Sequence, residues 1–257
     1  MVRLDVRDVV KIFAQRTGGE ATQVLALDGV TFQVRDREVV GVVGPSGCGK
    51  STLLGLVAGL IFPTRGEIIL DGARVMGPNP KIGFMLQKDL LLPWKTVMDN
   101  VELGQKIRRV PKEIRMERTM TLLNKYGLGE FSHKYPWQLS GGMRQRVALA
   151  RTMAIDPEIL LLDEPFSALD FQTRLLLQQD LYNILKESQK TVVLITHDIA
   201  EALVMSNRVL VMTKRPGKIK MDLPVELPQT DDLMVRRRSK ELSEYFQIIW
   251  ENLEHHL

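Results

Sequence analysis

A short glycine-rich segment near the start of the chain combines residue types that bind phosphate. Residues 44–52 read GPSGCGKST and follow the apolar run Val39–Val43. This sequence fits the Walker A pattern, in which glycines let successive backbone N–H groups face phosphate oxygens. A helix that begins near Lys50 would add the positive end of its dipole. We expect Lys50 to reach the β- and γ-phosphates of a nucleotide and the Ser51 hydroxyl to coordinate Mg²⁺.

Every residue of this loop is a candidate for nucleotide binding: Gly44, Pro45, Ser46, Gly47, Cys48, Gly49, Lys50, Ser51 and Thr52. Cys48 is the only cysteine of the sequence, so a disulfide within the chain is excluded. We interpret its side chain as a small tolerated group rather than a catalytic one. A thiol reagent at Cys48 is nevertheless expected to block nucleotide binding.

Two adjacent carboxylates follow a second apolar run, Ile159–Leu162. Side chains alternate in direction along a strand, so Asp163 and Glu164 can take different roles. We expect Asp163 to hold Mg²⁺ and Glu164 to polarise an attacking water. Such a pair is a weak signal alone, but it becomes specific downstream of a Walker A loop.

The segment Leu139–Gly142 is the most informative part of the sequence for assembly. Ser140 is a favourable N-cap for a helix that continues through Ala148–Ala150. Together with the Walker A loop and the two carboxylates, this segment resembles the ATP-binding subunits of ABC transporters, and the resemblance covers most of the chain. It implies that Ser140, Gly141 and Gly142 contact the γ-phosphate of ATP held by a second copy. Two copies would then close head to tail around ATP.

The same resemblance assigns three further residues. Gln87, after the strand-like run Ile82–Leu86, would ligand Mg²⁺ or water and report the nucleotide state to a transmembrane partner. His197, which follows Val192–Ile195, would contact the γ-phosphate, and Phe13 would stack on adenine where most members of the family have Tyr. Without the resemblance, such a Gln is usually a surface residue, such a His is structural, and Phe13 is a core side chain. The catalytic candidates are therefore Glu164, His197 and Gln87, and the metal-ligand candidates are Ser51, Gln87 and Asp163.

Short apolar runs alternate with helical spacing, which predicts an α/β fold with a mainly parallel sheet. In such a sheet, polar clusters at the carboxyl ends of strands converge. The runs Leu4–Val9, Ala26–Val34 and Glu67–Leu70 instead indicate a small antiparallel sheet. The resemblance implies a P-loop NTPase (RecA-like) core with an N-terminal antiparallel β subdomain and an inserted α-helical subdomain. We expect one domain over 1–257, in which 1–86 and 157–220 form the nucleotide-binding core, 87–156 the helical subdomain and 221–257 a tail with a helix.

The tail carries one apolar stripe at helical spacing. We expect this stripe to pack onto its own domain, with a partner or a membrane surface as the alternative. Its residues are Leu242, Tyr245, Phe246, Ile249, Trp250 and Leu253.

Composition and charge are those of an ordinary globular protein. Of the 257 residues 44% are hydrophobic and 26% charged, with a formal net charge of +4. The charge suits an anionic ligand or membrane face, or simply a solvated surface. The charged N-terminus does not fit a signal peptide, and the longest apolar stretch, Leu53–Phe62, is about half of the ~20 residues that cross a bilayer. We expect a peripheral protein at the cytoplasmic face of the cell membrane, attached through a partner.

Further segments resemble importer ATPases that work with a separate permease. Leu92–Trp94 is similar to the groove that receives a permease helix, and Ser167–Asp170 to the segment that links two ATP sites. Thr196–Ala202 and Val211–Ile219 resemble the nitrate/sulfonate/taurine-type importer ATPases. The resemblance implies uptake of a small solute and three partners: a second copy, permease subunits and, indirectly, an extracytoplasmic solute-binding protein. The alternative is a non-transport ABC ATPase that acts on nucleic acid or ribosomes. The basic residues are scattered along the sequence, however, so we expect no nucleic-acid partner.

Overall fold

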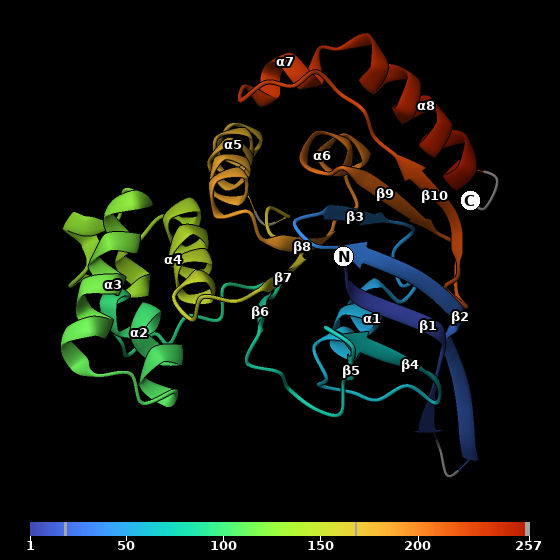
Figure 1. Ribbon diagram of the computed structural model, residues 1–257, viewed down its shortest axis with the longest axis horizontal. Coiled ribbons are helices and arrows are strands. Elements are labelled where there is room, and N and C mark those ends of the chain that lie inside the picture. The colour runs from blue at the N-terminus through green and yellow to red at the C-terminus, as the bar shows by residue number, and fades with distance from the viewer. Residues whose placement is uncertain (18–19, 168, 255–257) are drawn as a thin grey trace.

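The larger of two sheets organises the computed structural model, which describes residues 1–17, 20–167 and 169–254. Its strand order is β10-β9-β3-β8-β7-β6, parallel throughout except for the antiparallel pair β9–β10 (Figure 1). The predicted α/β class with a mainly parallel sheet is confirmed. The strands are β3 (Val39–Val43), β6 (Ile82–Met85), β7 (Ile159–Asp163), β8 (Thr191–Ile195), β9 (Arg208–Met212) and β10 (Ile219–Pro224).

The central strands are continuous apolar runs because both of their faces are covered. Along β7, Ile159 and Leu161 pack into the core that contains α1 (Lys50–Val57) and the antiparallel sheet. The alternate residues Leu160 and Leu162 pack into the core formed with the other helices. All four side chains are fully buried, so this strand holds the carboxylates at its end in a fixed position.

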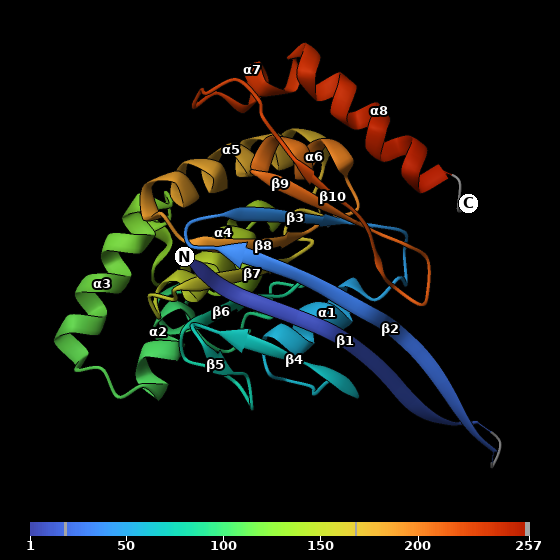
Figure 2. The same ribbon diagram turned by 45° about the vertical axis from the view of Figure 1, so that its right-hand side comes forward.

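The second sheet is antiparallel, as predicted, with the order β2-β1-β4-β5. Its first hairpin is longer than the sequence indicated, since pairing runs from Val2–Arg35 to Thr17–Glu20. The two long strands reach well beyond the rest of the sheet (Figure 2). The strands are β1 (Val2–Thr17), β2 (Glu20–Arg35), β4 (Arg65–Leu70) and β5 (Ala73–Arg74).

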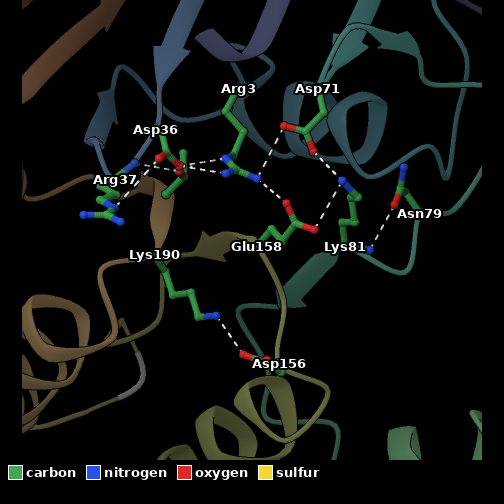
Figure 3. Close-up of polar contacts among 10 residues, drawn as sticks. Arg3, Asp36, Arg37, Asp71, Asn79, Lys81, Asp156, Glu158 and Lys190 are labelled. Atoms are coloured by element: carbon green, nitrogen blue, oxygen red, sulfur yellow. Dashed lines mark hydrogen bonds and ion pairs between the residues drawn. The ribbon is translucent and has the colours of Figure 1, made fainter. Parts of the chain in front are cut away.

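A cluster of ion pairs joins the two sheets at the start of β7 (Figure 3). The guanidinium of Arg3 on β1 contacts Asp36 at 2.8 Å, Asp71 at 3.4 Å and Glu158. Lys81 contacts Asp71 at 2.8 Å and Glu158 at 3.2 Å. Isolated surface ion pairs contribute little, but shared partners and a mostly covered Arg3 make this network a specific link between the sheets.

Helices cover the parallel sheet, and three of them gather beyond β6 (Figure 1). Those three, α2 (Val97–Ile107), α3 (Lys112–Lys125) and α4 (Gly141–Met153), lie between β6 and β7 in sequence, with short 3-10 turns at Gly129–Phe131 and Pro136–Gln138. The domain boundaries proposed from the sequence stay a prediction. The remaining helices are α5 (Phe171–Ser188), α6 (Ile199–Met205), α7 (Leu233–Arg237) and α8 (Lys240–Glu254).

The apolar stripe of α8 packs on its own chain, the alternative favoured from the sequence. Ile249 is fully buried and Leu242 nearly so, both within the main core. Trp250 stays 42% exposed and stacks on Phe246. Within the described ranges no helix combines the length and apolar character that a bilayer span requires. Residues 255–257 of the tail and Ala168 lie outside the described residues.

Candidate functional site

The loop between β3 and α1 has the geometry of a phosphate-binding loop. Gly47 and Gly49 adopt positive φ angles of 72° and 106°, which favour glycine. The Lys50 ammonium folds back over the loop and donates to the carbonyls of Gly44 at 2.8 Å and Pro45 at 3.0 Å. Among the described residues no side chain caps α1, so the first N–H groups of this helix remain available to an anion.

A cavity of about 560 Å³ opens over this loop. Phe13 on β1 stands at its wall, and the Lys11 ammonium lies 4.9 Å from the centre of that ring. Because Phe13 is 38% exposed, the alternative that it is a core side chain is wrong. The residues that line the cavity are Phe13, Val24, Ala26, Ser46, Gly47, Gly49, Lys50, Ser51, Thr52, Gln87, Glu164, His197 and Arg215.

Glu164 contacts residues that follow two neighbouring strands of the sheet. Its Oε2 accepts a hydrogen bond from Gln87 Nε2 at 3.1 Å and lies 3.2 Å from His197 Nδ1. Gln87 follows β6, Glu164 follows β7 and His197 follows β8, and these strands are neighbours in the sheet. Glu164 is therefore in direct contact with both of the other catalytic candidates.

The backbone at Glu164 is itself unusual. Its φ of 45° lies in the left-handed region, where a side chain costs about 1 kcal/mol or more. Ser167 supports this turn, because its hydroxyl donates to the Glu164 carbonyl at 3.1 Å. A strained residue that also gathers two polar partners at a cavity is typical of a functional site.

Asp163 and Ser51 form the second polar pair of the site. Asp163 is 6% exposed. Burial raises the pKa of its carboxyl, while a hydrogen bond from the Ser51 hydroxyl and the charge of Lys50 oppose that rise. A carboxylate and a hydroxyl beside a phosphate loop are the oxygen donors that suit Mg²⁺, which completes its shell with phosphates and water. The donor chemistry thus fits the predicted metal.

Cys48 is less accessible than the expected reaction with a thiol reagent requires. Its side chain is 1% exposed and packs in the core with Leu53 and Leu54. Burial raises the pKa of the thiol above its usual value, outweighing the opposing charge of Lys50. A buried thiol is a poor nucleophile, so the structure argues against labelling of native Cys48. Its backbone stays part of the loop, as do Gly44 and Pro45, and the residues that line the cavity include none of the three.

The segment with Ser140 is placed apart from this cavity. Ser140 is the N-cap of α4, and its Oγ accepts from Met143 N at 3.3 Å. A Cβ on Gly142 would lie 2.8 Å from Thr173 of α5, so that glycine permits close packing. As far as the described residues show, Ser140, Gly141 and Gly142 do not line the cavity that contains Lys50. Their contact with a second copy's nucleotide stays a prediction.

Helix α4 is tied to the segment that follows Gln87. Arg144 Nε donates to the Asp89 carboxylate at 3.1 Å. Arg151 donates to the carbonyls of Leu90 at 2.7 Å and Asp89 at 2.5 Å. Farther along, the buried Asn100 amide holds both backbone groups of Leu92. Hydrogen bonds therefore fix this segment to α2 and α4.

The structure also describes the segments around Asp170 and Trp94, which the sequence singled out. Asp170 caps α5 by accepting from Thr173 N at 3.0 Å, and this bond lowers the pKa of its carboxyl. Trp94 is 69% exposed and Leu90 53% exposed, which leaves apolar surface next to Leu92. The roles proposed from the resemblance for these segments stay predictions.

Sequence reasoning missed Val24, Ala26 and Arg215 as lining residues of the cavity. Val24 and Ala26 belong to β2, and pairing with β1 brings Val24 opposite Phe13. Arg215 lies in the connection between β9 and β10. Its basic turn was visible in the sequence, but nothing local indicated that the turn docks on the phosphate loop.

Comparison with known proteins supports the predicted family. The family described as ABC transporter matches residues 27–167. A taurine import ATP-binding protein of Yersinia pestis is 42% identical over 234 residues, which cover 86% of this chain and 92% of the relative. A nitrate import ATP-binding protein of Synechocystis is 41% identical over 239 residues, which cover 93% of this chain and 88% of the relative.

A solved structure supports the fold. A dimeric ATP-binding cassette in a post-hydrolysis state, bound to ADP and Pi, is similar with a TM-score of 0.75 and 33% identity, over 87% of this chain and 99% of that chain. This likeness confirms the predicted P-loop core with its antiparallel and helical parts. The chain belongs to the ABC transporter family, as one of its ATP-binding proteins, and it is an ATPase.

Proposed function

We propose that this chain is the ATP-hydrolysing subunit of an ABC importer and that the cavity over Lys50 is its ATP site. The contact of Glu164 with both Gln87 and His197 at the edge of that cavity carries the proposal. It brings a carboxylate base, an amide and an imidazole to the place where the terminal phosphate of a loop-bound nucleotide would end.

Each group has a distinct task in hydrolysis. The loop N–H groups and Lys50 bind the phosphates, and Lys50 leaves the Gly44 and Pro45 carbonyls to do so. Glu164 accepts a proton from the attacking water, and His197 orients the terminal phosphate. Ser51, Asp163 and Gln87 would hold Mg²⁺, which neutralises charge on the phosphates when bound. Phe13 offers its exposed ring face to the base.

A second copy completes the site. Ser140 and the following glycines stand at the N-terminus of α4, where free N–H groups attract an anion. In a head-to-tail pair this helix end would approach the γ-phosphate that the other copy's Lys50 binds. Closure of the pair around two ATP molecules would drive the permease, and hydrolysis would release it.

The relatives named for taurine and nitrate import support uptake of a small solute, with an anion of that kind as the first candidate. The exposed Trp94 and Leu90 offer the apolar surface that a permease segment would cover. We infer a peripheral location at the cytoplasmic face of the cell membrane and an extracytoplasmic solute-binding protein as the indirect partner. The transported solute is selected by those partners.

The decisive experiment is Glu164→Gln. Gln keeps the size of the side chain and removes the base, so hydrolysis should fall about 100-fold or more. ATP binding should persist, and light scattering should detect an ATP-dependent dimer. Near-normal turnover would refute the role of Glu164. Lys50→Ala should weaken ATP binding itself, and Glu117→Gln, on the exposed face of α3, is the control for loss of one carboxylate.

Import requires a separate measurement. The chain should copurify with its permease from membranes. Vesicles that contain the complex should take up solute only when ATP is present on the side of the membrane where this subunit lies. Recovery of the chain with nucleic acid or ribosomes, and without a permease, would instead support the non-transport alternative.

A further inference from the structure

The connection between β9 and β10 is fixed against the phosphate loop at Gly217. Gly217 N donates to the Ala26 carbonyl at 2.9 Å, and Asp28 N donates to the Gly217 carbonyl at 3.0 Å. A Cβ at Gly217 would lie 2.1 Å from the Cys48 carbonyl oxygen, so only glycine allows this approach. The connection therefore comes down beside β2 in Figure 2 and rests directly on the loop that contains Lys50.

Internal hydrogen bonds hold the tip of this turn. Thr213 N donates to the Lys218 carbonyl at 3.0 Å and closes the turn. The Thr213 hydroxyl donates to the Pro216 carbonyl and accepts from Lys218 N, both at 3.0 Å. Arg215 stands between these anchors, so the position of its backbone is defined relative to the cavity.

The Arg215 guanidinium points to the phosphate loop. Its Nε donates to the Gly47 carbonyl at 3.4 Å, and its Nη2 lies 3.5 Å from the place where a Gly47 Cβ would stand. The side chain is exposed and lines the same cavity as Lys50 and Phe13. In the described part of the chain no carboxylate pairs with it.

A bond of 3.4 Å to a neutral carbonyl is weak and exchanges at little cost for a bond to a phosphate oxygen. A guanidinium is a rigid, permanently charged donor that matches phosphate geometry. A guanidinium without a carboxylate partner, beside a loop of phosphate-binding N–H groups, is thus placed to meet an anion in the cavity that Lys50 also lines.

We propose that Arg215 binds the phosphate chain of the bound nucleotide, as a second cation of the ATP site besides Lys50. The inference rests on the proposed nucleotide site. The β9–β10 turn then contributes directly to nucleotide affinity, and its contact is electrostatic rather than specific for the base.

Calorimetric titration with Mg-ADP, which is not turned over, tests this contact. Arg215→Gln should raise the dissociation constant about three- to tenfold, as expected for a partly exposed charge-assisted contact. Arg215→Lys should retain part of the affinity. The control is Arg118→Gln, which removes the same charge from the exposed face of α3 and should leave the constant unchanged. The ratio of the dissociation constant of Arg215→Gln to that of the parent should shrink at high salt.

Two outcomes overturn the proposal. One is an unchanged dissociation constant in Arg215→Gln while Lys50→Ala still loses binding, in which case the ATP site stands without Arg215. The other is a raised dissociation constant in Arg215→Gln whose ratio to the parent value does not depend on salt. The variant would then disturb the turn rather than a charge contact. If Lys50→Ala also binds normally, the proposed nucleotide site itself fails.

Discussion

Glu201, in the first turn of α6, gives a pH-dependent stability that can be measured. The side chain is 3% exposed and accepts a hydrogen bond from Gln178 Nε2 at 2.9 Å. Burial raises the pKa of its carboxyl from 4.5 to about 7, and the nearby charge of Asp198 adds to this rise. Hydrogen bonds from Thr196 and Gln178 and the charge of Arg174 oppose it.

The sign follows from proton binding. Because the pKa is higher in the folded state, the folded chain holds more protons than the unfolded chain between pH 4.5 and about 7. The free energy of unfolding therefore falls as pH rises through this window. A rise of that size corresponds to about 3 kcal/mol in full, of which about 2 kcal/mol is lost between pH 5 and pH 8.

Glu201→Gln keeps the shape of the protonated carboxyl and cannot ionise. Urea unfolding without nucleotide, followed by circular dichroism, should show the variant gaining about 2 kcal/mol relative to the parent as pH goes from 5 to 8. Glu117→Gln, which is exposed on α3, should show no such gain. The reasoning is refuted if parent and Glu201→Gln have parallel pH dependence, because the carboxyl would then be ionised in the fold at little cost.

Two further experiments test the packing of α8 and the reactivity of Cys48. Ile249→Ala on α8 should lower the free energy of unfolding by about 2–5 kcal/mol, whereas Trp250→Ala should lower it less because that ring is half exposed. Equal losses would mean that α8 does not pack through Ile249. Native Cys48 should react with a thiol reagent far more slowly than Cys48 in urea, and equally fast labelling would show that the phosphate loop opens readily.

The convergence of Gln87, Glu164 and His197 was predictable because the rule for parallel sheets needs little tertiary detail. Each residue follows an apolar run, and carboxyl ends of parallel strands share one edge. The order β6-β7-β8 was not predictable, since an apolar run does not specify its neighbour. That order places the carboxylate in the middle, where it contacts both other groups.

The properties of Cys48 and Arg215 depend on long-range docking. Cys48 is buried because its side chain packs into the core under the loop, where the Lys50 ammonium also lies 3.9 Å from its Sγ. Arg215 reaches the site only because Gly217 lets the β9–β10 turn rest on the loop backbone. The spacing of residues in the sequence does not reveal the Arg215 contact, because Arg215 and Gly47 are 168 residues apart along the chain.

The link between α4 and the segment after Gln87 bears on how one chain can sense closure. Gln87 touches Glu164 inside the cavity, and Asp89, two residues later, is held by Arg144 and Arg151 of α4. The N-cap of that same helix is Ser140. We infer that a shift of α4 that brought Ser140 toward a second copy would also move the segment beside Gln87, through the bonds of Arg144 and Arg151 to Asp89. If two copies pair as proposed, their assembly would be mechanically connected to the placement of the proposed hydrolytic groups within each chain, although Ser140 does not line the cavity among the described residues.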